Sequence, residues 1–186
     1  MATAKLRVSG GSARGLPISE PKGLRLRPTS GLVREALFNI LGDLTEGARV
    51  LDLYAGTGAV GIEALSRGAD SATFVDAEAS ACQAILQTLV RAGLSSNATV
   101  LRGRLPAALE TVAGPFSLVF LDPPYGLDTA EETLRAASRQ VSPGGLVVYE
   151  HATRYNPPER PQGLTLADRR AYGDSALTVY ALQEGE

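Results

Sequence analysis

Apolar and polar positions divide the chain into strands that alternate with helices. Short, mainly apolar runs, typical of buried strands, lie at 50–53, 72–75, 98–101, 116–121 and 146–150. Apolar residues three or four positions apart, typical of helices, occur at 29–41, 59–65, 78–92 and 127–141. Strands that alternate with helices predict an α/β fold whose parallel sheet carries helices on both faces.

The spacing also predicts which side of two helices faces the core. The 29–41 helix can begin at a capping Thr29 or Ser30, and we expect Arg34 on its polar side. Its apolar face consists of Val33, Leu37, Phe38 and Leu41. The 78–92 helix turns four residues inward, namely Cys82, Ile85, Leu86 and Leu89. We interpret Cys82 as a small core residue rather than a reactive thiol.

Both ends of the chain depart from the alternation. Residues 6–8 and 16–18 flank a glycine-rich stretch and predict a small hairpin with a mobile basic tip. Residues 164–166 and 176–180, connected by 169–174, predict two further strands that make a seven-stranded sheet with an antiparallel edge strand. We therefore expect a hairpin extension at 1–28 and one α/β domain at 29–186.

Length and composition narrow the class of protein. A chain of 186 residues that is 44% hydrophobic suffices for one domain with a full core. It has no apolar run of membrane-spanning length and no apolar block typical of a signal peptide. One cysteine and one histidine argue against disulfides and a metal site. We expect a cytoplasmic monomer without bound metal or membrane contact.

Charge is distributed unevenly along the chain. The net charge is −2, but residues 1–34 contain seven cations and one acid, whereas residues 35–186 contain 11 cations and 19 acids. The cations of the first part alternate with glycine and precede a predicted cofactor domain. This pattern favours contact with a polyanion such as nucleic acid over a merely solvated surface.

The stretch from Arg49 to Leu65 has the pattern of a nucleotide-cofactor site. A buried strand leads into Gly56, Gly58 and Gly61, which fit the G-x-G-x-x-G spacing and allow a tight turn before a helix. Asp76 follows at the end of the next strand, where a carboxylate can bind both hydroxyls of a ribose. The combination predicts an adenosine-containing cofactor, although the pattern alone does not say which one.

A second motif, Asp122-Pro123-Pro124-Tyr125, follows the apolar 116–121 strand. Two prolines cannot continue a strand ladder, so they stiffen a turn. The Asp122 carboxylate and the Pro123 carbonyl can accept the two hydrogens of one amino group, and Tyr125 offers a flat face for a planar ring. Such acceptors stabilise positive charge that develops on an attacking nitrogen, as on the exocyclic amine of a nucleobase.

Two other features invite a functional interpretation that we do not favour. Asn156-Pro157-Pro158 is similar to the first motif, but polar residues precede it and Glu159 follows it, so it reads as a loop. His151 lies near the end of the fifth strand, where a packed or hydrogen-bonded role is expected. A methylated amine can lose its proton to water, so no strong base is required.

The chain resembles the class I, S-adenosylmethionine-dependent amino-methyltransferases, and within them the RsmD family. The resemblance spans residues 5–182 in order, and its motifs are RVSGGSARG, RPTSGLVREALFNIL, LDLYAGTGAVGIEALSRGA, FLDPPY, VVYEH and RRAYGDSAL. Members of that family are bacterial enzymes that methylate the 2-amino group of one guanine in small-subunit (16S) ribosomal RNA. The resemblance thus implies a Rossmann-like class I methyltransferase fold, S-adenosylmethionine as cofactor, and 16S RNA or an assembling small subunit as partner.

The resemblance also assigns roles to residues. Those implied around the cofactor are Asp52, Tyr54, Ala55, Gly56, Thr57, Gly58, Asp76, Ala77, Gly103 and Arg104. Those implied at the guanine, and so in catalysis, are Asp122, Pro123, Pro124 and Tyr125. Those implied in RNA contact are Arg7, Arg14, Arg25, Arg27 and Arg34.

One departure from the family pattern concerns adenine. Family members often carry an acid after the third strand to contact the adenine amino group, but this chain has Arg102-Gly103-Arg104. Arg104 cannot accept that hydrogen bond. The resemblance therefore leaves the contact to a backbone carbonyl.

Three alternatives stay open at the level of the residues. A dehydrogenase shares the glycine turn and Asp76 but has no use for Asp122-Pro123-Pro124-Tyr125. A DNA or RNA adenine-N6 methyltransferase shares that motif, although a larger target-recognition domain is expected of a DNA enzyme. A non-enzymatic RNA-binding protein explains the basic N-terminal part but leaves the glycine turn and Asp122 without a role.

Overall fold

Seven strands form one sheet in the computed structural model, which describes residues 6–21, 23, 31–124 and 126–182. The sheet order is β3-β2-β1-β4-β5-β7-β6. The strands are β1 (Arg49–Leu53), β2 (Ser71–Asp76), β3 (Ala98–Arg102), β4 (Phe116–Leu121), β5 (Val141–Ala152), β6 (Leu164–Tyr172) and β7 (Ser175–Leu182). The helices are α1 (Gly31–Leu41), α2 (Ala59–Ser66), α3 (Ala79–Ala92) and α4 (Ala130–Ser138), with short 3₁₀ turns η1 (Gly42–Thr45), η2 (Ser95–Asn97) and η3 (Ala107–Thr111).

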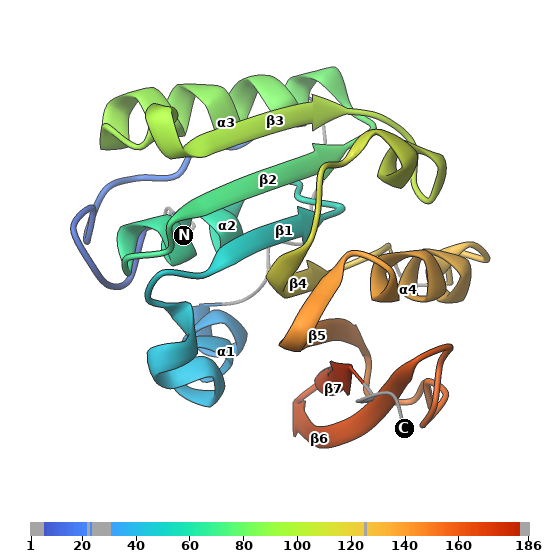
Figure 1. Ribbon diagram of the computed structural model, residues 1–186. Helices are drawn as coiled ribbons and strands as arrows, with labels where there is room; N and C mark the ends of the chain where they lie inside the picture. The colour runs from blue at the N-terminus through green and yellow to red at the C-terminus, as the bar shows by residue number, and fades with distance from the viewer. Residues whose placement is uncertain (1–5, 22, 24–30, 125, 183–186) are drawn as a thin grey trace.

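Strand direction confirms the predicted class of sheet. Strands β1 to β5 pair in parallel, and β7 pairs antiparallel with both β5 and β6. The arrowheads of β1, β2 and β3 therefore point to one side in Figure 1. The order reverses at β1, which has β2 on one side and β4 on the other, so β1 and β4 form a topological switch point where open α/β sheets bind ligands. This is a Rossmann-like class I methyltransferase fold.

Alternate residues of the strands supply two separate cores, one on each face of the sheet. Val50 of β1 packs with residues of α1, α2 and α3, whereas Leu51 and Leu53 pack with residues of η3 and α4. Side chains of successive strand residues point to opposite faces, so the two clusters lie on opposite sides. The prediction of helices on both faces is confirmed.

The face of α3 that meets the sheet is narrower than predicted. Cys82, Ile85 and Leu89 are buried, but the side chain of Leu86 is 51% exposed, so its predicted inward position is wrong. Successive helical residues are 100° apart, and Ile85 already occupies the centre of the buried face. Cys82 is a core residue, and burial raises the pKa of its thiol.

Arg34 lies on the buried face of α1, so its predicted position on the polar side is wrong, and its burial argues against the predicted RNA contact. Its side chain is 3% exposed and lies 3.5 Å from a carboxylate oxygen of Glu63. Spacing explains this, because Arg34 precedes Leu37 by three residues and Phe38 by four, and both are buried. Burial lowers the pKa of Arg34, partly offset by Glu63.

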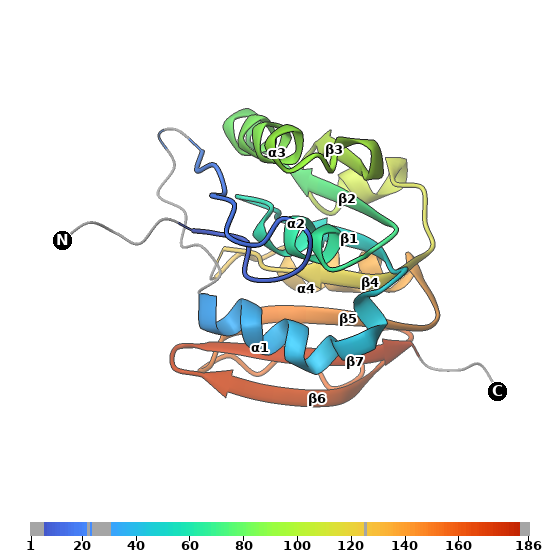
Figure 2. The same cartoon turned by 90° about the vertical axis from the view of Figure 1, so that its left-hand side faces the viewer.

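The N-terminal segment forms the predicted hairpin, reduced to one antiparallel bridge between Arg7 and Pro17. The tip was predicted to be mobile, but it is held against α2, because the Ser12 N–H donates to the Ser66 carbonyl at 2.7 Å. Figure 2 shows this segment crossing in front of α2, on the side of the sheet where β1 and β2 begin. Arg25, Arg27 and the predicted cap at Thr29 or Ser30 lie outside the described residues.

The terminal hairpin is longer than predicted. The connection expected at 169–174 shrinks to Gly173 and Asp174, because Arg169 to Tyr172 continue β6. This stretch is an exposed edge strand, so charged residues occur in it without breaking the ladder.

Membrane-spanning helices and metal-binding clusters are both absent from the described residues. None of their helices is both long and apolar enough to cross a membrane. None of their His, Cys, Asp and Glu side chains gather into a group of three or more that would hold a metal ion.

Candidate functional site

The glycine turn begins with an unusual backbone conformation at the end of β1. Tyr54 has φ +58° and is the one described residue other than glycine with positive φ. Gly56 and Gly58 also lie in the left-handed region, at +56° and +69°. A left-handed conformation costs a non-glycine residue about 1–2 kcal/mol, and such strain gathers at functional sites. These three residues with positive φ, which lie within five consecutive positions, turn the chain sharply from β1 into α2.

Close packing also leaves no room for a side chain at the second and third glycines of the motif, Gly58 and Gly61. A Cβ on Gly58 would lie 2.8 Å from a carbon of Ile85 in α3. A Cβ on Gly61 would lie 2.3 Å from the Phe74 ring in β2. The first keeps the turn against α3 and the second keeps α2 against the sheet, as the G-x-G-x-x-G pattern predicts.

The Tyr54 side chain points to α4 rather than into the turn. Its hydroxyl lies 2.7 Å from Thr133 Oγ1, and the Thr133 hydroxyl donates to the Thr129 carbonyl at 2.9 Å. Because Thr133 has only one hydrogen to give, Tyr54 is the donor of the first bond. The backbone of Tyr54, and not its hydroxyl, is therefore the part that shapes the predicted cofactor site.

Asp52 supports the turn from below. Its side chain is 2% exposed, and its Oδ2 accepts the Gly61 N–H at 2.9 Å. Gly61 is the third residue of α2, so this carboxylate caps the helix in place of a side chain at Gly58. Burial raises the pKa of Asp52 to about 7, with nearby Asp76 adding to the shift. Asp52 thus has a structural role in the turn, and its contact with a cofactor stays a prediction.

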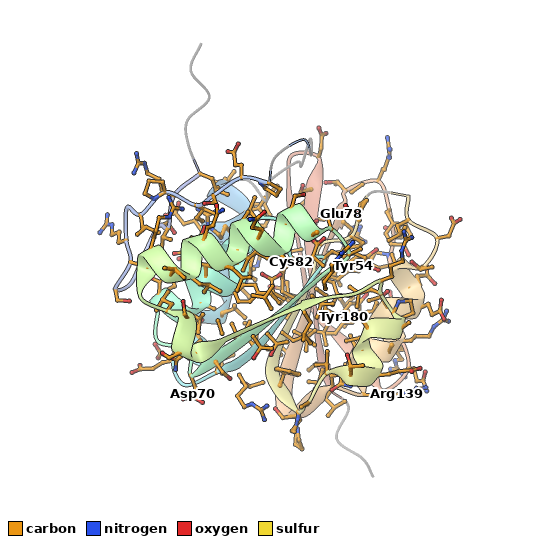
Figure 3. All side chains as sticks on the ribbon, turned by 90° about the horizontal axis from the view of Figure 1, so that it is seen from above. Tyr54, Asp70, Glu78, Cys82, Arg139 and Tyr180 are labelled. Carbon is orange, nitrogen blue, oxygen red and sulfur yellow. The ribbon has the colours of Figure 1, made fainter. Side chains whose placement is uncertain are left out.

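Asp76 connects the glycine turn to the end of β2. Its Oδ2 accepts the Gly56 N–H and its Oδ1 accepts the Glu78 N–H, both at 2.8 Å. The residue is half-buried, and each oxygen keeps a lone pair for a further donor. In Figure 3, Tyr54 and Glu78 are labelled near each other, and Asp70, which precedes β2, is labelled far from both. The structure thus brings together the two features that sequence spacing predicted for a ribose-containing cofactor.

The third strand closes the same side of the site. The Gly103 N–H donates to the Asp76 carbonyl at 2.9 Å, and a Cβ on Gly103 would lie 2.7 Å from the Ala108 Cβ. The Ala77 carbonyl accepts from Arg102 Nε at 3.2 Å. Arg104 is exposed, and its carbonyl accepts the Ala108 N–H at 2.9 Å. The Arg104 carbonyl therefore retains one lone pair for a further donor.

Asp122 lies beside the glycine turn on the neighbouring strand. Leu121 pairs with Leu53, and the Asp122 N–H donates to the Leu53 carbonyl at 3.4 Å. Pro123 is buried and Pro124 is exposed, with its carbonyl accepting the Leu127 N–H at 3.2 Å. Tyr125 lies outside the described residues. The two motifs thus meet at the switch point between β1 and β4.

Sequence reasoning gave no role to the residues that border Asp122 on β5 and α4. Tyr149 pairs with Leu121, is 4% exposed, and has its pKa raised to about 12 by burial, with Glu131, Tyr54 and Asp122 nearby. Because its pKa is raised, Tyr149 keeps its proton at neutral pH. The Tyr155 hydroxyl donates to Glu131 of α4. The motif that contains Tyr149 was visible in the sequence, but nothing in a single sequence marks a strand tyrosine as a neighbour of Asp122.

His151 has the packed role that the sequence predicted. It is 2% exposed, its Nδ1 lies 2.9 Å from the Ala152 carbonyl, and its Nε2 lies 2.7 Å from Thr178 Oγ1. Burial lowers its pKa, so the ring is neutral at physiological pH. With both nitrogens engaged, His151 is not placed to serve as a base. Asn156 lies in a loop, as predicted, and accepts from Arg169 at 2.8 Å.

The basic N-terminal segment lies away from this site. Arg7 and Arg14 are exposed, and the segment packs on the last turn of α2, whereas the glycine turn precedes the first. Eight helical residues separate the two ends by about 12 Å. Of the predicted RNA-contacting residues, Arg7 and Arg14 therefore belong to a segment beside the last turn of α2, whereas the glycine turn lies beside the first.

Comparisons with known proteins point to one family. The chain matches the family model described as "Conserved hypothetical protein 95" over residues 6–181. It is 32% identical to ribosomal RNA small subunit methyltransferase D of Escherichia coli (strain K12), covering 96% of this chain and 90% of that protein. It is 34% identical to a Bacillus subtilis (strain 168) protein named as a candidate rRNA methyltransferase, YlbH, covering 94% and 98%. A solved Escherichia coli structure described as a candidate methyltransferase, yhhF, has a TM-score of 0.86 and 31% identity, covering 97% and 99%.

Proposed function

This chain belongs to the RsmD family, whose model it matches over residues 6–181, and we propose that it methylates the 2-amino group of a guanine in small-subunit (16S) ribosomal RNA with S-adenosylmethionine as methyl donor. The names of its relatives support a methyltransferase that acts on ribosomal RNA. The guanine and its 2-amino group rest on the resemblance and on the residues at the site.

The observation that carries the proposal is the junction of the two motifs. Asp76 bonds to Gly56 in the glycine turn, and Asp122 bonds to the strand that leads into that turn. A cofactor held by the turn and a planar base held by Asp122-Pro123-Pro124-Tyr125 therefore meet at the switch point of the sheet. A dehydrogenase or a binding protein gives the second motif no role.

The described residues fit S-adenosylmethionine. Asp76 presents half-buried carboxylate oxygens with lone pairs for the ribose hydroxyls, and the turn at Gly56 and Gly58 exposes backbone rather than side chains. Arg104 and Gly103 offer backbone at the far side of Asp76 for adenine. The cofactor supplies a methyl group on a positively charged sulfur.

The chain's own residues then orient the amine and stabilise charge. The Asp122 carboxylate and the Pro123 carbonyl accept the two amine hydrogens, which turns the nitrogen lone pair toward the methyl group. When the amine takes up the methyl group, positive charge would develop on its nitrogen, next to the Asp122 carboxylate. The carboxylate stabilises that charge most at the transition state, and the nitrogen then releases its proton to water. A neutral His151 with two engaged nitrogens agrees with a reaction that needs no strong base.

RNA contact is proposed for the exposed cations of the N-terminal segment. Arg7 and Arg14 are the described members of the predicted set that reach solvent, and phosphate contacts by such residues supply affinity without sequence recognition. A paired guanine has to be accessible or flipped out of its helix to reach Asp122. We propose that the enzyme acts as a monomer in the cytoplasm.

Mass mapping of methylated nucleosides in ribosomal RNA tests the proposal. RNA from cells with and without the gene is digested and compared, and we expect the loss of one N2-methylguanosine from 16S RNA. The wild-type gene should restore it and the Asp122→Ala gene should not. Loss of an N6-methyladenosine, or an unchanged map, would contradict the proposed target.

A further inference from the structure

The tip of the N-terminal segment (residues 9–15) is bound to the last turn of α2 by polar contacts that methyl transfer does not require. The Ser66 hydroxyl donates to the Gly10 carbonyl at 2.6 Å and accepts the Ala13 N–H at 2.9 Å. The Ser66 carbonyl accepts the Ser12 N–H at 2.7 Å. One residue of α2 therefore binds three backbone groups of the tip, those of Gly10, Ser12 and Ala13.

A buried carboxylate one turn earlier holds the base of the tip. Glu63 is fully buried, and its two oxygens accept the N–H and the hydroxyl of Ser9, each at 2.7 Å. Arg67 Nε donates to the same carboxylate at 2.8 Å, and Arg34 approaches it at 3.5 Å. Arg34 Nη2 in turn donates to the Arg7 carbonyl at 2.6 Å. Glu63 thus contacts residue 9 directly and residue 7 through Arg34.

Backbone shape makes this contact specific. Gly11 has φ +76°, and a Cβ there would lie 1.7 Å from the Ser66 carbonyl oxygen, so the tip rests directly on the helix backbone. Gly15, in the same tip, has φ +85° but would place a Cβ in open space. The two glycines share a positive φ, and of the two only Gly11 has the backbone of α2 where a Cβ would lie.

A third attachment holds the returning strand of the segment. Thr88 Oγ1 of α3 accepts the Ser19 N–H at 2.9 Å, and Arg91 donates to the Pro17 carbonyl at 2.9 Å. The segment is thus fixed at its base, tip and exit, while Arg7 and Arg14 stay exposed.

We infer that Glu63 and Ser66 of α2 are positioning residues for RNA binding, because they hold the segment that presents Arg7 and Arg14 in one fixed place relative to the cofactor turn. The inference rests on the proposed function. Apolar packing also holds the segment, since Val8 and Ile18 are buried and Leu6, Ala13 and Leu16 pack partly buried against the core, but the tip itself is bound to α2 by hydrogen bonds. A buried ion-pair network contributes little net stability compared with apolar side chains, but it fixes one geometry. Fixing cations before RNA arrives lowers the entropy lost on binding.

Helix α2 supports the glycine turn at one end and the tip at the other. Its first turn follows the glycine turn and is capped by Asp52, and its last turn carries Glu63 and Ser66. Every residue of α2 is buried, so the helix cannot shift against the sheet without disturbing both ends. The distance from the cofactor turn to the tip is therefore constant.

Two glycine variants test the inference because they share the strain of a left-handed residue. Gly11→Ala should push the tip off Ser66, whereas Gly15→Ala should leave it in place. Amide hydrogen exchange should show faster exchange at Ser12 and Ala13 in the first variant alone. With in-vitro-transcribed 16S RNA, Gly11→Ala should raise Kd by about tenfold, the scale of lost preorganisation, with an unchanged Kd for S-adenosylmethionine. Gly15→Ala should bind RNA like the wild type.

A second comparison separates positioning from mere folding. Arg14→Ala should weaken RNA binding by the wild type and have little further effect in the Gly11→Ala background, because a displaced tip no longer presents Arg14. Equal RNA affinity of Gly11→Ala and the wild type, despite faster exchange at the tip, would overturn the inference. So would an undiminished effect of Arg14→Ala in the Gly11→Ala background. If the wild type binds this RNA as expected but transfers no methyl group to it, the proposed function fails while the positioning role stands.

Discussion

The two ends of α2 are each fixed by a buried acid, but the acids are compensated differently. At the first turn of α2, which follows the glycine turn and is here called the cofactor end, Asp52 accepts one backbone N–H, from Gly61. At the opposite end, Glu63 accepts two hydrogen bonds from Ser9 and lies against the guanidinium groups of Arg34 and Arg67. One acid is thus balanced by a peptide dipole and the other by full positive charges.

This difference teaches what each end is built to do. A carboxylate held by a single amide has its pKa raised to about 7 by burial, so Asp52 supports the turn in either charge state. A carboxylate held by two arginines and two serine donors keeps distant segments in one geometry, because removing any partner leaves a buried charge. The cofactor end of α2 is organised by backbone, and the other end by side-chain charge.

Replacing Glu63 should have the largest effect on stability and would show how far the charged end depends on its acid. Glu63→Ala leaves Arg34 buried without its carboxylate and should lower the free energy of unfolding by about 3–5 kcal/mol. Glu63→Gln keeps one acceptor oxygen for Ser9 and should cost less. Urea unfolding followed by circular dichroism measures both, with exposed Glu35→Ala as a control expected within about 0.5 kcal/mol of the wild type. A small loss in Glu63→Ala would contradict the network.

Replacing Asp122 should affect the chemical step and leave both ends of α2 intact. Asp122→Ala should lower kcat by on the order of 10²-fold or more, because the carboxylate stabilises charge that develops only during transfer. Asp122→Asn keeps an acceptor oxygen and should retain more activity. Single-turnover methyl transfer measures this, and Asn156→Ala, in the second Pro-Pro turn, is the matched control with unchanged kcat. A wild-type rate for Asp122→Ala together with an inactive Asn156→Ala would mean that the wrong turn has been chosen.

How much of this was predictable depends on whether a feature is local in sequence. The glycine turn, Asp76 and the prolines after β4 follow strand ends within a few residues, so spacing alone placed them at one edge of the sheet. The apolar spacing of α1 also placed Arg34 inward, but its charge led to the opposite prediction. Its partner Glu63 lies on another helix, and no local pattern connects them. The fixed tip was missed for the same reason, since glycine and serine are typical of free loops.

Stability as a function of pH should distinguish the two acids. The pKa of Asp52 is about 7 in the folded protein and lower in the unfolded chain, so the folded state holds its proton more tightly. Asp52 therefore makes the free energy of unfolding fall as pH rises from about 4 to about 7. Asp52→Asn removes this contribution, so its stability relative to the wild type should increase across that range and level off above it. Denaturant unfolding at several pH values tests this, with exposed Asp70→Asn as the control. A pH-independent difference would argue against a neutral Asp52.

The smallest expected effect concerns one cation of the tip. Arg14→Ala should weaken binding to 16S RNA modestly and reduce the slope of log K against log salt concentration by about one, because one phosphate contact is lost. Exposed Arg139→Ala on the other face should leave the slope unchanged. Filter binding across salt concentrations measures both, and equal slopes for Arg14→Ala and the wild type would remove Arg14 from the RNA contact.

Calorimetric titration of both ligands into Asp76→Ala and Gly11→Ala tests most directly whether the ends of α2 have separate roles. Asp76→Ala should weaken S-adenosylmethionine binding by about 1–3 kcal/mol, the scale of lost charge-assisted hydrogen bonds, and leave RNA affinity unchanged. Gly11→Ala should weaken RNA binding and leave the cofactor affinity unchanged. We therefore predict that each variant weakens the binding of one ligand and leaves the affinity for the other unchanged. If each variant weakened both ligands, or if Asp76→Ala bound the cofactor as tightly as the wild type, the division of α2 into a cofactor end and an RNA end would be wrong.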